Sequence, residues 1–176
     1  CRSDESLAAL KERLEFEIHA LADLKFAEDE ITYLASLGHY QADYLDFLSS
    51  FSLKANQVTV TILDDQLAIR IDGSWLDVIL WEVPLLAIIC ELRCHVKYPN
   101  STPIDAVELL KEKLGALEKI SDDFHFVDFG TRRRFSKEVH HAIVDHLTLH
   151  CPHFSGTSNL FLAKKYGIPA VGTQAH

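Results

Sequence analysis

The order of hydrophobic patterns after Ser121 constrains the fold more than any other feature of this sequence. A short aromatic run at 124–129 predicts a strand, and apolar residues at helical spacing from Phe135 to Leu147 predict a helix behind it. The alternation continues with a strand end or turn, a short helix and a third strand, at 154–156, 159–166 and 168–171. Repeated β–α units of this kind imply a parallel sheet or barrel, with sites at the carboxyl ends of the strands.

The first 121 residues follow a different pattern, dominated by helices. Ser3 can cap a first helix, whose apolar stripe comprises Leu7, Leu10, Leu14, Ile18, Leu21 and Leu24. We expect two shorter helices at 28–37 and 41–51. Alternating apolar residues on both sides of Asp64-Asp65 then predict a β-hairpin over 58–71.

Two longer helices complete this part of the chain. The run from Trp75 to Tyr98 predicts a helix that is bent or broken at Pro84. Thr102-Pro103 predicts a cap with proline in the first helical position, for a helix that ends near Ile120.

Composition favours a globular protein in a reducing compartment. Of the 176 residues, 48% are hydrophobic, which is enough to fill a core. The most apolar stretch, 78–90, is interrupted by Glu82 and Pro84 and is too short to cross a membrane, and no signal peptide is evident. Cys90 and Cys94 fit buried thiols rather than a disulfide framework, so we expect a cytoplasmic location. A chain that lacks Met, even at position 1, is expected to be a piece of a longer protein.

Charge is unevenly distributed along the chain. Only two of the 26 acidic residues follow Gly130, whereas six of the 17 basic residues do. A basic end on an acidic chain suggests a local anion site rather than a nucleic-acid surface, which would need a broader basic face. Chance clustering is the simpler alternative.

Three junctions between a predicted strand and the loop that follows it carry polar residues. The first, Asp128 to Arg134, is the most informative. Gly130 allows a sharp turn, and three arginines follow it at what we expect to be the N-terminus of a helix. Arginine binds phosphate or carboxylate with a planar fork. Solvated arginines at a helix start are the alternative, but the helix dipole disfavours positive charge there.

The other two junctions carry hydroxyl groups and a histidine. The segment 155–159 is rich in hydroxyl groups and could bind a ligand, or could cap the next helix through Ser158 or Thr157. After the third strand, 172–176 ends in His176, which could act as a general base or accept a phosphoryl group. A single histidine is more often structural.

A cluster of histidines could suggest zinc, but its spacing does not support a metal site. His146 and His150 share a helix face, yet there is no H-E-x-x-H motif and no C-x-x-C pair. The sequence also lacks G-x-G-x-x-G, the P-loop and the G-x-S-x-G elbow.

Taken in series, three motifs closely resemble nicotinate phosphoribosyltransferases. They are Asp128-Phe129-Gly130-Thr131-Arg132-Arg133-Arg134-Phe135-Ser136, Gly156-Thr157-Ser158-Asn159 and Gly172-Thr173-Gln174-Ala175-His176, and the earlier run 78–87 is similar too. The resemblance implies an α/β protein with a helical α+β domain at 1–121, which contains a hairpin and long helices. The first strands and helices of an irregular α/β barrel would follow at 122–176.

The resemblance also implies a reaction: ATP-coupled synthesis of nicotinate mononucleotide from nicotinate and phosphoribosyl pyrophosphate in NAD salvage, with Mg²⁺ on the leaving pyrophosphate. Phe129 would stack on the pyridine ring, and Arg132 would hold phosphate or pyrophosphate. Thr173 would contact nicotinate, and His176 would be the histidine that ATP phosphorylates. Ser158 stands where nicotinamide-using relatives carry an acid, and a neutral hydroxyl there would not repel the carboxylate of nicotinate.

Three alternatives stay open from the sequence. The parent protein could be a nicotinamide or a quinolinate phosphoribosyltransferase, or a non-catalytic binding homologue.

The family's N-terminal tyrosine segment and C-terminal phosphate loops are missing, so this chain alone is expected to be inactive. Relatives often complete a site from a neighbouring subunit, which makes a homodimer plausible.

Overall fold

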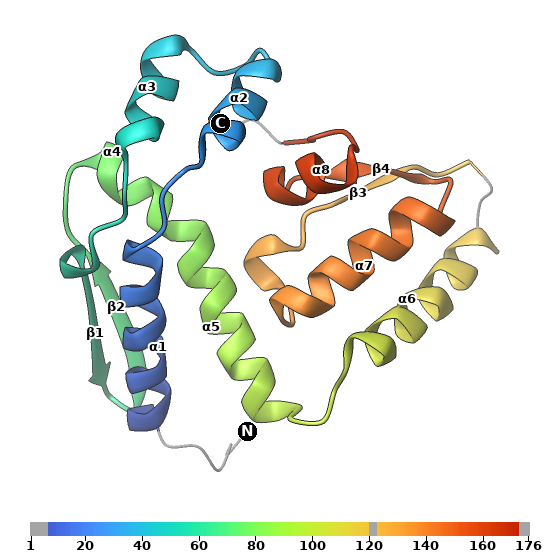
Figure 1. The fold of residues 1–176 in the computed structure, drawn as a ribbon. Helices are drawn as coiled ribbons and strands as arrows, with labels where there is room; N and C mark the ends of the chain where they lie inside the picture. Colours follow the sequence, from blue (N-terminus) through green and yellow to red (C-terminus); the bar gives the residue numbers. More distant parts are fainter. Residues whose placement is uncertain (1–6, 120–122, 173–176) are drawn as a thin grey trace. The chain divides into compact units, whose positions relative to one another are not determined.

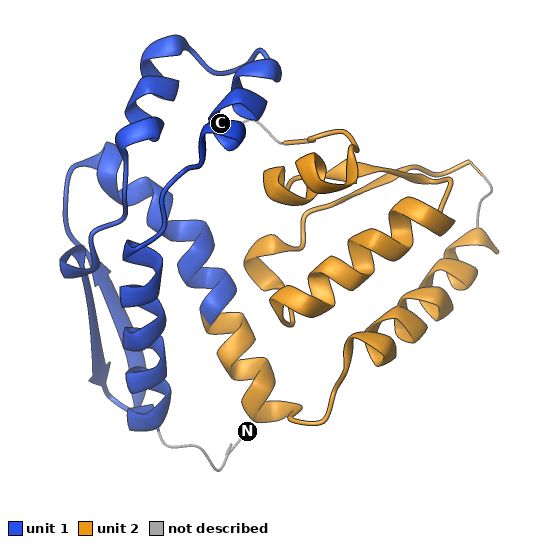
Figure 2. Cartoon of the chain, viewed as in Figure 1, with its two compact units in different colours: residues 1–88 blue, residues 89–176 orange. Residues whose placement is uncertain are grey.

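The computed structural model describes residues 7–119 and 123–172, which form two compact units divided between Ile88 and Ile89. Figure 2 shows that this division falls inside one helix, α5 (Glu82–Lys97). The boundary predicted near 121 stays a prediction. Ser3, Thr173 and His176 lie outside the described residues.

Unit 1 consists of helices and one β-hairpin (Figure 1). Its elements are α1 (Leu7–Ala22), α2 (Glu28–Ser36), α3 (Ala42–Ser50), the 3₁₀ turn η1 (Ala55–Gln57), β1 (Val58–Leu63), β2 (Gln66–Ile71), α4 (Trp75–Val78), the 3₁₀ turn η2 (Ile79–Trp81) and the first part of α5. The hairpin and the helices before it agree with the predictions. Asp64 and Asp65 both have positive φ, at 50° and 55°, as a tight turn between two twisted strands requires.

The core of unit 1 forms where α1 lies against the hairpin. Leu14 and Ile18 of α1 are buried, as is Val60 of β1. The stripe does not continue to Leu24, which lies beyond the end of α1 and is 62% exposed. Trp81 is fully buried, and its indole N–H donates to the side-chain oxygen of Gln57 at 3.2 Å, so its polar atom is satisfied.

The sequence predicted a bend or break at Pro84 in the helical run from Trp75 to Tyr98, and this position is wrong. The break falls at η2, between α4 and α5. Pro84 instead occupies the first turn of α5. Backbone N–H groups in a first turn have no acceptor within the helix, so proline is tolerated there.

Unit 2 contains the rest of α5, α6 (Pro103–Glu118) and a small parallel α/β arrangement. Its later elements are β3 (Phe126–Asp128), the 3₁₀ turn η3 (Thr131–Arg133), α7 (Lys137–His150), β4 (Phe154–Thr157) and α8 (Leu160–Tyr166). α6 packs on α7, while α7 and α8 both contact β4 (Figure 1). The buried residues of α7 and α8 include Val139, Val144, Leu147, Leu162 and Ala163.

The strands of unit 2 confirm the predicted parallel pairing. β3 pairs with β4, and Thr157 makes a further parallel bridge with Ala170. The third predicted strand is therefore a single bridge in the part of the chain that the structure describes. The closed barrel stays a prediction.

Candidate functional site at the strand ends of unit 2

The carboxyl ends of β3 and β4 lie side by side, which joins the first two predicted junctions. Asp128 is paired with Thr157, and the Ser158 N–H donates to the Asp128 carbonyl oxygen at 2.8 Å. The Val171 N–H donates to the Thr157 carbonyl oxygen at 3.0 Å, so the chain entering the third junction runs beside β4. The structure therefore brings the backbones of Phe129 and Ser158 to the same edge.

Asp128 is the centre of a hydrogen-bond network at this edge. Its Oδ2 accepts from the Thr157 hydroxyl at 2.6 Å and lies 2.8 Å from His140 Nε2, while its Oδ1 accepts from the Gly130 N–H at 2.8 Å. The side chain of Asp128 is 11% exposed, that of His140 4%, and Thr157 is fully buried. Both carboxylate oxygens are thus occupied by protein donors.

The pKa of Asp128 follows from this environment. Burial raises the pKa, but the hydrogen bonds from His140 and Thr157, the His140 charge and the Gly130 N–H together outweigh it and hold the pKa below its ordinary value. The carboxyl group is therefore ionised at neutral pH. An ionised carboxylate only accepts hydrogen bonds, so His140 Nε2 carries the donated proton.

The network continues through Asn159 to the loop after β3. The Asn159 N–H donates to the Thr157 hydroxyl at 3.0 Å, and the Asn159 side-chain amide donates to the Thr131 hydroxyl at 3.1 Å. We call the connected residues the Asp128 network: His140, Asp128, Thr157, Asn159 and Thr131. It joins the two loops that carry the predicted ligand-binding residues.

Asn159, rather than Ser158 or Thr157, caps the helix that follows. Its side-chain oxygen accepts from the Leu162 N–H at 3.0 Å, at the start of α8. The predicted capping of this helix through Ser158 or Thr157 is therefore wrong. Ser158 is partly exposed.

Two glycines permit the close approach of the strands and loops. A Cβ atom on Gly130 would lie 2.8 Å from Asp128 Oδ1, and one on Gly156 would lie 2.4 Å from the Pro169 carbonyl oxygen. Gly156 also has a φ of +146°, which residues with a side chain rarely adopt.

The arginines do not lie at the N-terminus of a helix, which corrects the prediction. Arg132 and Arg133 are exposed in η3, and α7 begins only at Lys137, after the Ser136 cap. The missed cap is Ser136, whose hydroxyl accepts from the backbone three residues later. Arg134 forms an ion pair with Glu91 of α5 at 3.1 Å, and both side chains are about four-fifths buried. That partner neutralises one of the three charges.

Phe129 is an exposed aromatic residue next to Asp128 in the chain. It directly follows β3 and is 47% exposed. An exposed ring beside a polar network is suited to stack on a flat ligand. Thr173 and His176, the two remaining predicted site residues, fall outside the described residues.

The hydrogen bonds and ion pairs of Asp128, His140, Thr157 and Glu91 were not predicted from the sequence. Asp128 was part of a motif without a role of its own, and no role was predicted for His140. A local signal existed for Asp128, because an acid at the end of a buried strand needs donors nearby. Nothing local could identify Glu91, which lies 43 residues before Arg134.

The thiols and histidines elsewhere offer no second site. Cys90, Cys94 and Cys151 are free and only partly buried, although the sequence favoured buried thiols. The rings of His146 and His150 lie 4.7 Å apart, and burial together with the His150 charge lowers the pKa of His146. Within residues 7–119 and 123–172, no three His, Cys, Asp or Glu residues gather closely enough to hold a metal ion. No helix there is long and apolar enough to cross a membrane.

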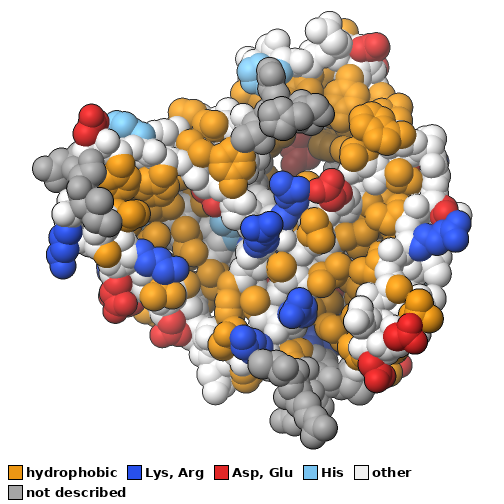
Figure 3. Space-filling model, turned by 180° about the vertical axis from the view of Figure 1, so that it is seen from behind, with side chains coloured by type: hydrophobic (Ala, Val, Ile, Leu, Met, Phe, Trp, Pro, Cys, Tyr) orange, Lys and Arg blue, Asp and Glu red, His pale blue; other side chains and the backbone are white. Residues whose placement is uncertain are grey.

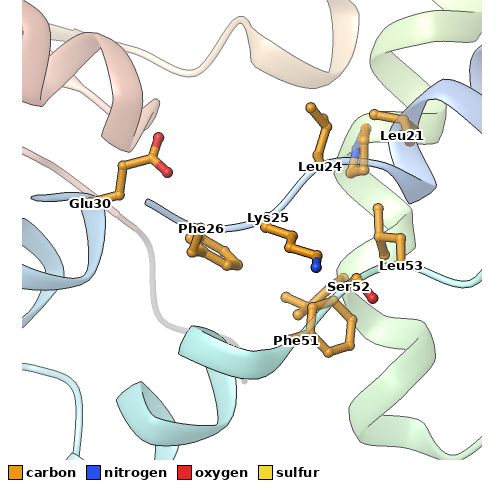
Figure 4. Close-up of a pocket in the computed structure, with 10 residues that line it drawn as sticks. Leu21, Leu24, Lys25, Phe26, Glu30, Phe51, Ser52 and Leu53 are labelled. Carbon is orange, nitrogen blue, oxygen red and sulfur yellow. The ribbon is translucent and has the colours of Figure 1, made fainter. Parts of the chain in front are cut away.

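Unit 1 contains a largely apolar pocket of about 360 Å³ (Figure 4). Its lining includes Leu21, Leu24, Phe26, Phe51 and Leu80, and Figure 4 shows Lys25 between the rings of Phe26 and Phe51. Its polar lining residues are Lys25, Glu30 and Ser52, and none of the residues that the sequence motifs predict to bind a ligand lines it. The strand ends of unit 2 are therefore the better candidate site.

A parallel α/β unit with glycine turns and polar groups at one strand edge belongs to the broad class of α/β proteins that bind ligands at the carboxyl ends of their strands. Comparison with known proteins defines the class more narrowly. Residues 1–90 match the N-terminal domain model of nicotinate phosphoribosyltransferase, and residues 124–176 match the model of the nicotinate phosphoribosyltransferase family. The chain belongs to the nicotinate phosphoribosyltransferase family.

Individual relatives agree with this assignment. The chain is 42% identical to a nicotinate phosphoribosyltransferase of Photorhabdus laumondii and 44% identical to one of Proteus mirabilis, with all of this chain covered in both cases. It spans 46% of the length of each.

Solved structures show the same fold. The crystal structure of nicotinate phosphoribosyltransferase from Vibrio cholerae matches with a TM-score of 0.91 at 32% identity, and that from Porphyromonas gingivalis with 0.86 at 34%. Each comparison covers 99% of this chain, but only 43% and 45% of the solved chains.

Proposed function

We propose that the protein containing this chain makes nicotinate mononucleotide and pyrophosphate from nicotinate and phosphoribosyl pyrophosphate, in NAD salvage. The pyridine nitrogen would attack the anomeric carbon of the ribose, and the bond from that carbon to pyrophosphate would break. The observation that carries the proposal is the junction of β3 and β4, which places Phe129 and Ser158 at one edge. Likeness to nicotinate phosphoribosyltransferases along the whole chain supports it.

The binding roles follow from the chemistry of each residue. Phe129 stacks on the pyridine ring, for which its partly exposed ring is suited. Arg132 neutralises phosphate or pyrophosphate from its exposed position in η3. Ser158 accommodates the carboxylate of nicotinate without introducing a like charge, and Thr173 adds a contact to nicotinate.

ATP enters the proposal through His176. The imidazole would attack the γ-phosphorus of ATP, and the bond between that phosphorus and the oxygen that leaves with ADP would break. Water would later release the phosphoryl group from His176 as inorganic phosphate. The phosphorylated state would reorganise the pyrophosphate site and tighten substrate capture. The support is the motif that ends in His176, since a histidine is a competent phosphoryl acceptor near neutral pH.

The Asp128 network does not provide a Mg²⁺ site of its own. Asp128 is the one carboxylate of the Asp128 network, and protein donors occupy both of its oxygens. Mg²⁺ prefers to keep several waters and to bind substrate phosphates. We therefore assign Mg²⁺ to the substrate, bound to the phosphates of phosphoribosyl pyrophosphate.

The activity is tested with purified full-length protein, nicotinate, phosphoribosyl pyrophosphate and Mg²⁺, with and without ATP. We expect nicotinate mononucleotide, formed faster with ATP. Replacing nicotinate with nicotinamide or quinolinate tests the two rival enzymes. Calorimetry that shows substrate binding without any turnover would instead indicate a non-catalytic homologue.

The phosphohistidine is tested with γ-labelled ATP. We expect acid-labile label on the full-length wild-type protein and none on His176→Asn. Label that persists in His176→Asn would remove the role of His176 while leaving the overall reaction in place.

A homodimer and a cytoplasmic location complete the proposal. A neighbouring subunit could complete the site, as the family resemblance implies. Light scattering of the full-length protein measures the assembly, and fractionation of cells measures the location.

A further inference from the structure

The Asp128 network lies where it can control ligand geometry, although none of its members was assigned to the ligand. Asp128 precedes Phe129, Thr157 precedes Ser158, and Thr131 precedes Arg132. Each proposed ligand-binding residue described by the structure thus follows directly after a network member. The network crosses from β3 to β4 and returns through Asn159 to the loop after β3.

Asp128 is not itself suited to bind the ligand. Its Oδ1 is taken by Gly130, and its Oδ2 by Thr157 and His140. A buried, ionised carboxylate is costly, and apolar side chains could join two strands at a lower cost. A charged network adds directional hydrogen bonds, which determine the distance and the angle between the ends of β3 and β4.

Resting on the proposed function, we propose that Asp128, Thr157 and Asn159 are positioning residues for its two substrates. The Thr157–Asp128 hydrogen bond fixes the Ser158 loop against Phe129 and so shapes the nicotinate site. The Asn159–Thr131 hydrogen bond fixes the loop that carries Arg132 and so shapes the phosphate site. The two bonds act on different substrates although they belong to one network.

Thr157 offers a matched pair of variants for the first bond. In the full-length enzyme, Thr157→Val keeps the shape but removes the hydroxyl, and with it the bond to Asp128 and the acceptor of the Asn159 N–H. Thr157→Ser keeps the hydroxyl. We expect Thr157→Val to raise the KM for nicotinate at least tenfold and the KM for phosphoribosyl pyrophosphate less than threefold. Thr157→Ser should keep both KM values within twofold to threefold of the wild type.

Asn159→Ser isolates the second bond. Serine is a good helix cap, so α8 keeps its start, but the shorter side chain cannot reach Thr131. We expect the opposite pattern, with a KM for phosphoribosyl pyrophosphate at least fivefold higher and a KM for nicotinate within twofold. This variant leaves the β3–β4 pairing intact, so it still tests the inference if Thr157→Val fails to fold.

The outcomes separate this inference from the function on which it rests. A wild-type enzyme that makes no product from nicotinate overturns the proposed function, and the positioning roles fall with it. An active wild type with equal nicotinate KM values in Thr157→Val and Thr157→Ser overturns the positioning role of Thr157 alone. A parallel rise of both KM values in Thr157→Val and Asn159→Ser, together with lower melting temperatures, would show a structural role only.

Discussion

Ser158 is the residue through which the proposed site would distinguish an acid from an amide. Its N–H is held by the Asp128 carbonyl oxygen, and Asn159 performs the capping of α8. Its hydroxyl is therefore not required by the helix. The backbone at this position is held by a hydrogen bond, so a charged side chain introduced here would start from a fixed position.

We predict that Ser158→Asp lowers kcat/KM for nicotinate at least tenfold in the full-length enzyme, or about 1.4 kcal/mol. The new carboxylate would repel that of nicotinate. Ser158→Asn, neutral and of similar size, should lose less than threefold. Steady-state kinetics of both variants measure the difference, and equal losses would point to size rather than charge.

Asp128 makes the stability of the protein depend on pH in a defined direction. Its pKa is lowered in the folded protein, so its contribution to stability is present above the ordinary pKa near 4 and is lost as the pH falls through the lower, folded value. At neutral pH the contribution is complete.

We predict that Asp128→Asn lowers the free energy of unfolding by about 1–3 kcal/mol at pH 7, because the amide must direct its N–H groups at one of the existing donors. The difference from the wild type should shrink as the pH falls from about 5 to 3. Melting temperatures of both proteins across this range measure it. A difference that is constant with pH would contradict the assigned ionisation.

At the scale of elements, the sequence predicted what is encoded locally. The hairpin turning at Asp64-Asp65 and the helix starting at Thr102-Pro103 both have their signals within a few residues, and both are confirmed. The parallel pairing of β3 and β4 followed from the alternation of strands and helices.

What the sequence could not predict depends on contacts between distant residues. Asp128 meets His140 and Thr157 across 12 and 29 positions, and Arg134 meets Glu91 across 43. The sequence also could not show that Pro84 would lie in the first turn of α5, where proline is tolerated. The helix break therefore falls before it, at η2. Motif resemblance predicted ligand-binding roles for Phe129 and Ser158, but it did not identify the side chains that hold their loops.

Gly156 lies in β4, and its backbone conformation leads to a prediction about stability. We expect Gly156→Ala to destabilise the full-length protein by about 3 kcal/mol or more, because its φ is +146° and the new Cβ would lie 2.4 Å from the Pro169 oxygen. Gly115→Ala in α6 is the matched control. Its Cβ would meet no other atom within 4 Å, so it should gain about 0.5–1 kcal/mol. Thermal unfolding compares the two, and similar effects would contradict the strand geometry.

At the scale of the whole molecule, the chain accounts for less than half of its relatives' length. It exposes large apolar side chains in both units, among them Phe16, Trp75 and Ile104, and Figure 3 shows hydrophobic side chains open on one face. Exposed apolar groups of this size commonly mark surfaces that other parts of a protein or other subunits cover. The proposed activity is therefore tested on the full-length protein, and this chain would contribute the β3–β4 edge to it.

We propose that this edge accepts the acid rather than the amide. This proposal is tested most directly by giving the full-length enzyme equal concentrations of nicotinate and nicotinamide with phosphoribosyl pyrophosphate, Mg²⁺ and ATP, and separating the two mononucleotides. Our account predicts an excess of nicotinate mononucleotide of at least a hundredfold, about 2.8 kcal/mol in transition-state binding. Equal amounts of the two products, or an excess of nicotinamide mononucleotide, would contradict it.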